Sequence, residues 1–138
     1  MDRVEAIDEP ALRRLVETFY GRAREDALLG PVFGRAVHDW PAHFDLLTDF
    51  WSSVLLGTGR FHGRPLPKHA AAGVTSDLFP RWLELWGEAV DSLFEPEPAE
   101  VIKAKAAHIG RSMSAALWLS SQAAQGVTPE SARRSSGA

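Results

Sequence analysis

The sequence predicts a single all-α domain, and three observations support that prediction. In four long segments the apolar residues recur at helical spacing, whereas alternating strand patterns are scarce. Prolines and glycines gather between those segments, where helices must end. The chain has 138 residues, 45% of them hydrophobic, which we expect to form one core and to leave no room for a second domain.

The first helix is expected at about residues 9 to 24. Asp8 is placed to cap it, and Pro10 suits a first helical turn. The segment after this helix ends at Gly30 and Pro31. No helix is predicted between residues 25 and 38. The inward stripe of this first helix is Leu12, Leu15, Val16, Phe19, Tyr20 and Ala23.

The second helix is expected to start near Asp39, which is its predicted cap, and to end at Gly57 and Gly59. Its broad inner face carries Trp40, His43, Phe44, Leu47, Trp51, Val54 and Leu55. From residue 59 to 73 the chain is rich in glycine, proline and basic residues. Because a long helix cannot continue through Pro65 and Pro67, we expect a loop there and a short helical piece around His69.

The third helix is expected to begin near Ser76, as its cap, with Pro80 in the first turn. Pro96 and Pro98 end it, and the last helix follows at about residues 97 to 120. Residues 1–120 would then form the domain, and the small and polar residues 121–138 a disordered tail. The inward stripes are Leu78, Phe79, Trp82, Leu85, Trp86, Ala89, Val90, Leu93 and Phe94 in the third helix, and Ile102, Ala106, Ile109, Met113, Ala116 and Leu117 in the fourth.

Composition excludes several classes of function. The chain has no cysteine, which removes disulfides, thiolate metal sites, iron–sulfur clusters and thiol nucleophiles. A net charge of -3 argues against nucleic acid or an anionic membrane as the main partner. The polar, acidic N-terminus does not fit a signal peptide, and no apolar run approaches the length of a membrane span. We therefore expect a soluble, cytoplasmic protein.

The residue types suggest a haem pocket. Haem needs a flat apolar slot, an axial nitrogen and a polar group on its open face, and the chain carries 5 Trp, 7 Phe and 5 His. His69 follows two prolines and lies between two predicted long helices, so a stiff segment could aim it at a pocket. On the residues alone a solvated loop histidine is the favoured interpretation, because most polar loop residues face water.

Three inward-facing polar side chains have two interpretations each. His43 is either a hydrogen-bonded core histidine, which is favoured, or a group beside a ligand or a gate. The hydroxyl of Tyr20 needs a partner, commonly a backbone carbonyl, although a bound ligand would also serve. Trp82 is either plain core or an N–H donor to a ligand. The sequence lacks HExxH, a P-loop, a dinucleotide-binding glycine pattern and a nucleophile elbow.

The ordered elements resemble the truncated haemoglobins, most closely the third group of that family. The resemblance covers roughly residues 10 to 118, and the glycine pairs of the other truncated groups are missing. The matching stretches are Phe19-Tyr20 with Arg22 and Asp26, Leu29 to Phe33, Asp39 to His43, Asp49 to Gly57, Gly63 to His69, and Phe79 to Trp86.

This resemblance implies a two-over-two helical sandwich around haem b, with His69 as the proximal ligand to the iron. Tyr20 and Trp82 would point at the ligand on the distal side, where His43 would either swing and gate access or bind the iron itself when no gas is present. The resemblance also implies that Phe33 packs on the edge of the haem and that Leu47 lines its distal face. We expect Trp86 to be a further haem contact. The basic pair Arg64 and Lys68 either pairs with the haem propionates or is solvated.

The implied function is to bind dioxygen and other diatomics such as NO and CO. Two hydrogen bonds from Tyr20 and Trp82, each worth about 1 kcal/mol, would slow oxygen release. Slow release suits redox or detoxification chemistry better than transport. One alternative is a peroxidase-like or nitric-oxide-detoxifying enzyme that uses a separate reductase. The other is a haem-free helical interaction module, in which the apolar stripes bury one another.

Overall fold

The computed structural model describes residues 3–63, 69 and 74–124. All named elements in that part of the chain are helical: α1 (Glu9–Ala23), α2 (Gly30–Ala36), α3 (Trp40–Leu56), the 3-10 turn η1 (Ser76–Leu78), α5 (Phe79–Leu93) and α6 (Pro96–Ala124). A backbone bridge joins Val4 to Phe94 and ties the N-terminal segment to the α5–α6 turn. The predicted all-α class is confirmed.

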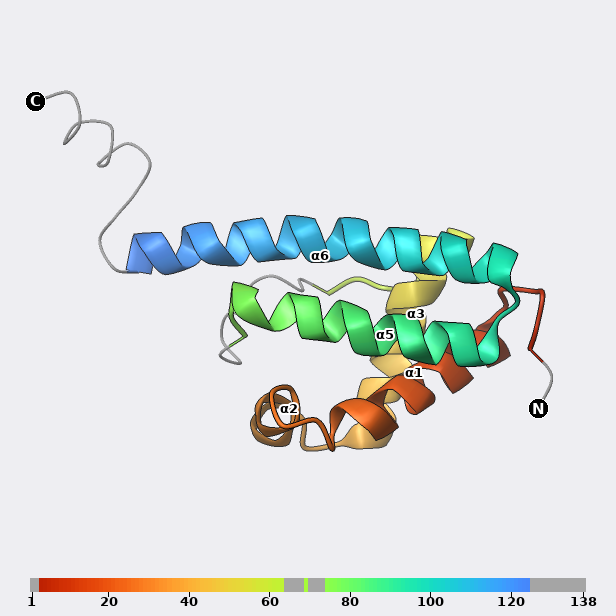
Figure 1. Ribbon diagram of the computed structural model, residues 1–138, viewed down its shortest axis with the longest axis horizontal. Coiled ribbons are helices and arrows are strands. Elements are labelled where there is room, and N and C mark those ends of the chain that lie inside the picture. Colours follow the sequence, from red (N-terminus) through yellow and green to blue (C-terminus); the bar gives the residue numbers. More distant parts are fainter. Residues whose placement is uncertain (1–2, 64–68, 70–73, 125–138) are drawn as a thin grey trace, which may run out of the picture.

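The helices form two layers of two. Helices α5 and α6 lie side by side, and the pair of α1 and α3 crosses them, with α1 packed on α5 (Figure 1). The last turns of α6 extend past the start of α5 (Figure 1). The expected two-over-two sandwich is therefore confirmed. No helix in the described part of the chain is long and apolar enough to cross a bilayer.

The ends of α1 and α3 follow the predicted signals. The Asp8 carboxylate accepts a hydrogen bond from the Ala11 amide at 2.9 Å, and Asp39 caps α3 through the Ala42 amide at 3.1 Å. At the end of α3, Gly57 has a φ of 68°, a left-handed conformation that glycine adopts without a Cβ penalty. The caps fix where the two crossing helices begin, and so the register of their inward stripes.

Helix α2 was not predicted. Its seven residues include two glycines and a proline, which conceal any helical pattern. The helix forms because tertiary contacts supply what propensity lacks. Val32 and Leu29 are buried in the core, and the Asp26 carboxylate accepts hydrogen bonds from the Leu28 and Leu29 amides, each at 3.0 Å.

The start of α5 differs in detail from the prediction. Ser76 does not cap the helix: it lies inside the 3-10 turn, and the extended residue before it is Thr75. The Thr75 hydroxyl bonds the carboxylate of Asp77. Pro80 lies in the first turn of α5, as expected.

Helix α6 is longer than predicted. It starts at Pro96 and runs to Ala124, four residues into the segment expected to be a tail. The remaining residues of that tail, 125–138, lie outside the described residues.

The core lies where α1, α5 and α6 meet. The predicted stripe of α1 is buried in full. Further buried side chains include Leu85, Ala89, Val90, Phe94, Ala99, Ile102 and Ala106. The cavity described below lies beside this packed core.

Candidate functional site

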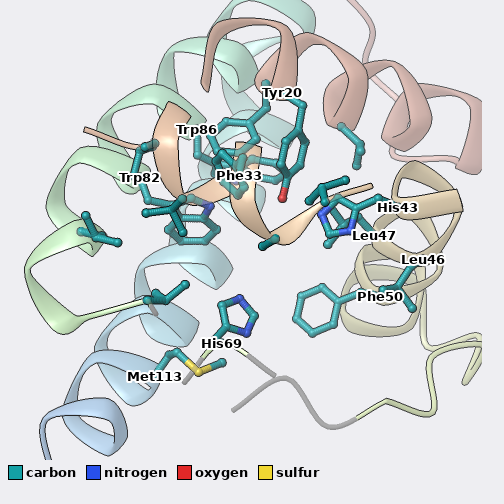
Figure 2. Close-up of a pocket in the computed structure, with 18 of the residues that line it drawn as sticks. Tyr20, Phe33, His43, Leu46, Leu47, Phe50, His69, Trp82, Trp86 and Met113 are labelled. Atoms are coloured by element: carbon teal, nitrogen blue, oxygen red, sulfur yellow. The ribbon is translucent and has the colours of Figure 1, made fainter. Parts of the chain in front are cut away.

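An aromatic cavity of about 330 Å³ lies between α1, α2, α3, α5 and α6, within the size range typical of ligand pockets. Figure 2 shows its lining side chains converging from elements far apart in the sequence. The lining residues are Val16, Phe19, Tyr20, Leu29, Val32, Phe33, Ala36, Val37, His43, Leu46, Leu47, Phe50, Trp51, Phe61, His69, Val74, Leu78, Phe79, Trp82, Trp86, Ile109 and Met113.

The imidazole of His69 lies at one end of this cavity. Figure 2 places it beside Met113 and opposite Tyr20 and His43. Its backbone is helical, and its carbonyl accepts a hydrogen bond from the Val74 amide at 3.0 Å. The predicted short helical piece is thus seen at His69 itself, while residues 64–68 and 70–73 lie outside the described residues.

Tyr20 and His43 form the polar end of the cavity. Their rings meet edge to face with centroids 5.3 Å apart, and the Tyr20 hydroxyl points into the cavity (Figure 2). Burial raises the pKa of Tyr20 well above its ordinary value, so the hydroxyl keeps its proton and can donate it in a hydrogen bond. This end of the cavity therefore combines one reliable donor with an imidazole.

The surroundings of the His43 imidazole favour its neutral form. Its pKa is lowered by burial first and by the charge of His69 second. Within the described part of the chain its Nε2 is buried and has no hydrogen-bond partner. A neutral ring of this kind suits an uncharged ligand.

Three stacked indoles line one side of the cavity, between its His69 end and its Tyr20 end. Trp86 lies between Trp51 and Trp82, with centroid distances of 4.6 and 6.0 Å and interplanar angles of 19° and 13°. The stack gives the cavity a flat apolar side. The Trp86 Nε1 is buried without a hydrogen-bond partner among the described residues.

The structure brings most of the predicted site residues together. Tyr20, Phe33, His43, Leu47, His69, Trp82 and Trp86 all line the cavity. Arg64 and Lys68, the expected partners of the propionates, lie outside the described residues. Sequence reasoning named no site role for Leu46, Phe50, Phe61 or Met113. Of these, only Met113 had a signal, its place on the predicted inward stripe of the last helix.

Known proteins resemble this chain in sequence and in fold. No protein-family model matches the sequence. The chain is 32% identical over 109 residues to the group 3 truncated haemoglobin ctb of Campylobacter jejuni, covering 75% of this chain and 86% of that protein. The chain belongs to the group 3 truncated haemoglobins. The crystal structure of a group III truncated haemoglobin from Campylobacter jejuni superposes with a TM-score of 0.79 at 31% identity, covering 84% of this chain and 95% of that one.

Membership of this family implies a haem-binding globin, and the cavity of this truncated haemoglobin fits the group. Flat indole and phenyl rings suit a planar macrocycle, and one imidazole reaches in from the end opposite Tyr20. The buried Nε2 of His43 and Nε1 of Trp86 lack protein partners in the described part of the chain. Buried polar groups normally have a partner, and a bound group in the cavity would be placed to supply one.

Proposed function

We propose that this truncated haemoglobin holds haem b through His69 and binds dioxygen or another small diatomic at the Tyr20 end of the cavity. The observation that carries the proposal is the placement of one imidazole across an aromatic cavity from a buried tyrosine hydroxyl (Figure 2). When bound, haem would supply an iron that binds small diatomic ligands, and the residues of this chain would hold and surround it.

Each side chain then has a separate task. His69 would supply the nitrogen that holds the iron, and Phe33 and Trp86 would pack against the flat group. Tyr20 donates a hydrogen bond to the diatomic, with Trp82 as a second donor. Leu47 keeps water away from that end, and the neutral His43 turns aside to admit the ligand.

Slow ligand release follows from two donors in a buried site. Each neutral hydrogen bond contributes about 1 kcal/mol net, so two slow dissociation by about tenfold or more. Such a protein is a poor carrier and suits redox or detoxification chemistry, for which a separate reductase supplies electrons. Consumption of nitric oxide or peroxide with a purified reductase distinguishes turnover from simple binding.

Replacement of the proposed axial ligand tests the assignment. We expect His69→Gly to lose stable haem uptake, and added imidazole to restore the optical spectrum by taking the vacated position. His108→Gly is the matched control, since His108 is exposed on α6 and its loss leaves uptake unchanged. A His69→Gly protein with the parent's ferrous spectrum and no response to imidazole contradicts the proposal. A parent protein that never takes up haemin favours the haem-free interaction module instead.

A further inference from the structure

A second aromatic layer covers the polar end of the cavity. Trp40 does not line the cavity itself, yet its ring contacts the rings of Tyr20 and His43 at centroid distances of 5.5 and 5.9 Å. It is half-buried. Trp40 therefore contacts both polar side chains of the cavity without lining the cavity itself.

The spacing of residues along α3 creates this cover. Trp40 is the first residue of the helix, so His43 and Phe44 follow it by three and four positions and share its face. Trp40 and Phe44 have centroids 5.8 Å apart. A ring at the first position of α3 thus lies over the imidazole one turn later.

The outer side of Trp40 is held by a cation. The guanidinium of Arg24 lies 4.2 Å from the centroid of the indole, well within the range of a cation–π contact. The Arg24 amide donates to the Tyr20 carbonyl at 3.0 Å at the end of α1. Arg24 is therefore one helical turn beyond Tyr20, and its contact joins the end of α1 to the start of α3.

We propose that Trp40, held by Arg24, is a lid over the polar end of the cavity, and that this contact sets how often His43 turns aside to admit a small uncharged ligand. The inference rests on the proposed function of His43 as a gate. The rings of His43 and Trp40 meet at an interplanar angle of 88°, so the imidazole can turn toward Trp40 only when the indole moves. Arg24 stabilises the closed arrangement without touching the ligand.

A lid has a kinetic signature that separates it from a ligand donor. Weakening the lid speeds ligand entry and escape by the same factor and leaves affinity unchanged, whereas removing a donor speeds escape alone. A cation–π contact at a partly exposed site is worth a factor of about three in an equilibrium. We therefore expect Arg24→Gln to raise both rate constants about threefold.

The experiment compares Arg24, which directly follows α1, with Arg13 inside that helix. Arg13 lies over the Phe44 ring at 5.5 Å and pairs with Asp45 and Glu17, but it does not contact Trp40 in any of these interactions. Carbon monoxide is flashed off the haem-loaded full chain, and association and dissociation are measured for the parent, Arg24→Gln, Arg24→Lys and Arg13→Gln. We expect both constants to rise in Arg24→Gln, to rise less in Arg24→Lys, and to stay at the parent values in Arg13→Gln.

A second measurement reports on the contact directly. The indole N–H resonance of Trp40, identified by its loss in Trp40→Phe, should shift in Arg24→Gln and not in Arg13→Gln. Parent rates in Arg24→Gln overturn the lid, and so does an unmoved Trp40 resonance. His43→Ala distinguishes failure of the gate from failure of the lid. If His43→Ala leaves the association rate unchanged, His43 is not a gate. If His43→Ala accelerates ligand entry and Arg24→Gln does not, His43 is a gate but Trp40 is not its lid.

Discussion

At the scale of single residues, the site depends on side chains that pack in the core and also present a polar atom to the cavity. Tyr20 packs against Phe19 and Phe33, with centroids 4.9 Å away in each case, so its ring belongs to the core. Its hydroxyl nevertheless points into the cavity (Figure 2). A substitution that keeps the ring and removes the hydroxyl therefore isolates the ligand contact from packing.

Tyr20→Phe is that substitution. We expect the oxygen dissociation rate to rise about fivefold, because one neutral hydrogen bond of about 1 kcal/mol is lost. The association rate should change little, since the ring and its contacts stay. Stopped-flow displacement of oxygen by carbon monoxide measures the dissociation rate, and flash photolysis of the oxygen complex measures the association rate.

The matched variant on the facing helix is Trp82→Phe, which removes the other proposed donor. We expect Trp82→Phe to speed oxygen release too, but less than Tyr20→Phe does. The double variant should release oxygen faster than either single variant. If both single variants release oxygen at the parent rate, the assignment of the distal donors is wrong.

At the scale of elements, one carboxylate joins three parts of the chain. Asp26 accepts the Leu28 and Leu29 amides before α2 and pairs with the Arg81 Nε of α5 at 2.8 Å. Its side chain is only 8% exposed, whereas that of Asp45, in the Arg13 ion pair, is 72% exposed. The buried carboxylate should therefore matter for stability and the exposed one should not.

Asp26→Asn is expected to lower the free energy of unfolding by about 1–2 kcal/mol at neutral pH, since bonds to a charged acceptor are lost or weakened. Asp45→Asn is the control and should cost under about 1 kcal/mol. Urea titrations of the haem-loaded proteins measure the difference. Equal effects of the two substitutions would show that the Asp26 contacts add nothing specific.

The same carboxylate predicts a pH dependence. The Leu29 amide first, and then the Arg81 and Leu28 bonds, hold the pKa of Asp26 below its ordinary value of 3.8. A lowered carboxyl pKa stabilises the fold above the ordinary value, and that stability is lost as the pH falls through the lowered pKa. The gap between the parent and Asp26→Asn should therefore be constant near neutrality and shrink below about pH 4. Unfolding measured across that range checks the sign.

Local signals predicted the elements wherever a side chain or a fixed backbone angle set the boundary. Asp8, Asp39 and Gly57 act within a few residues, so sequence shows them directly. Helix α2 was missed because its stability comes from Asp26 and from burial of Val32, neither of which its own residues reveal. Ser76 was misassigned because a cap is defined by backbone conformation, and Thr75 has the extended one.

At the scale of the whole molecule, sequence stripes could name which residues face inward but not which of them meet. His69 and Tyr20 come together only because the helices cross, and periodicity carries no crossing angle. The resemblance to a family supplied that missing information for six lining residues. It gave no role to Phe50, Phe61 or Met113, whose places in the lining depend on this chain's own packing.

The two ends of the sandwich should differ in how they respond to loss of haem. The packing of α1, α5 and α6 around Leu12, Val90 and Ile102 lies away from the cavity, so it stays protected in the haem-free chain. Helices α2 and α3 close the cavity with half-buried side chains such as Phe33 and Leu47, and lose part of their support. We expect hydrogen exchange in the haem-free protein to accelerate in α2 and α3 and to stay slow in α1, α5 and the first half of α6.

Added haemin should reverse the difference and raise the melting temperature, because a ligand that binds only the native state stabilises it. Uniform acceleration over all helices would show instead that the fold has no core independent of the cavity.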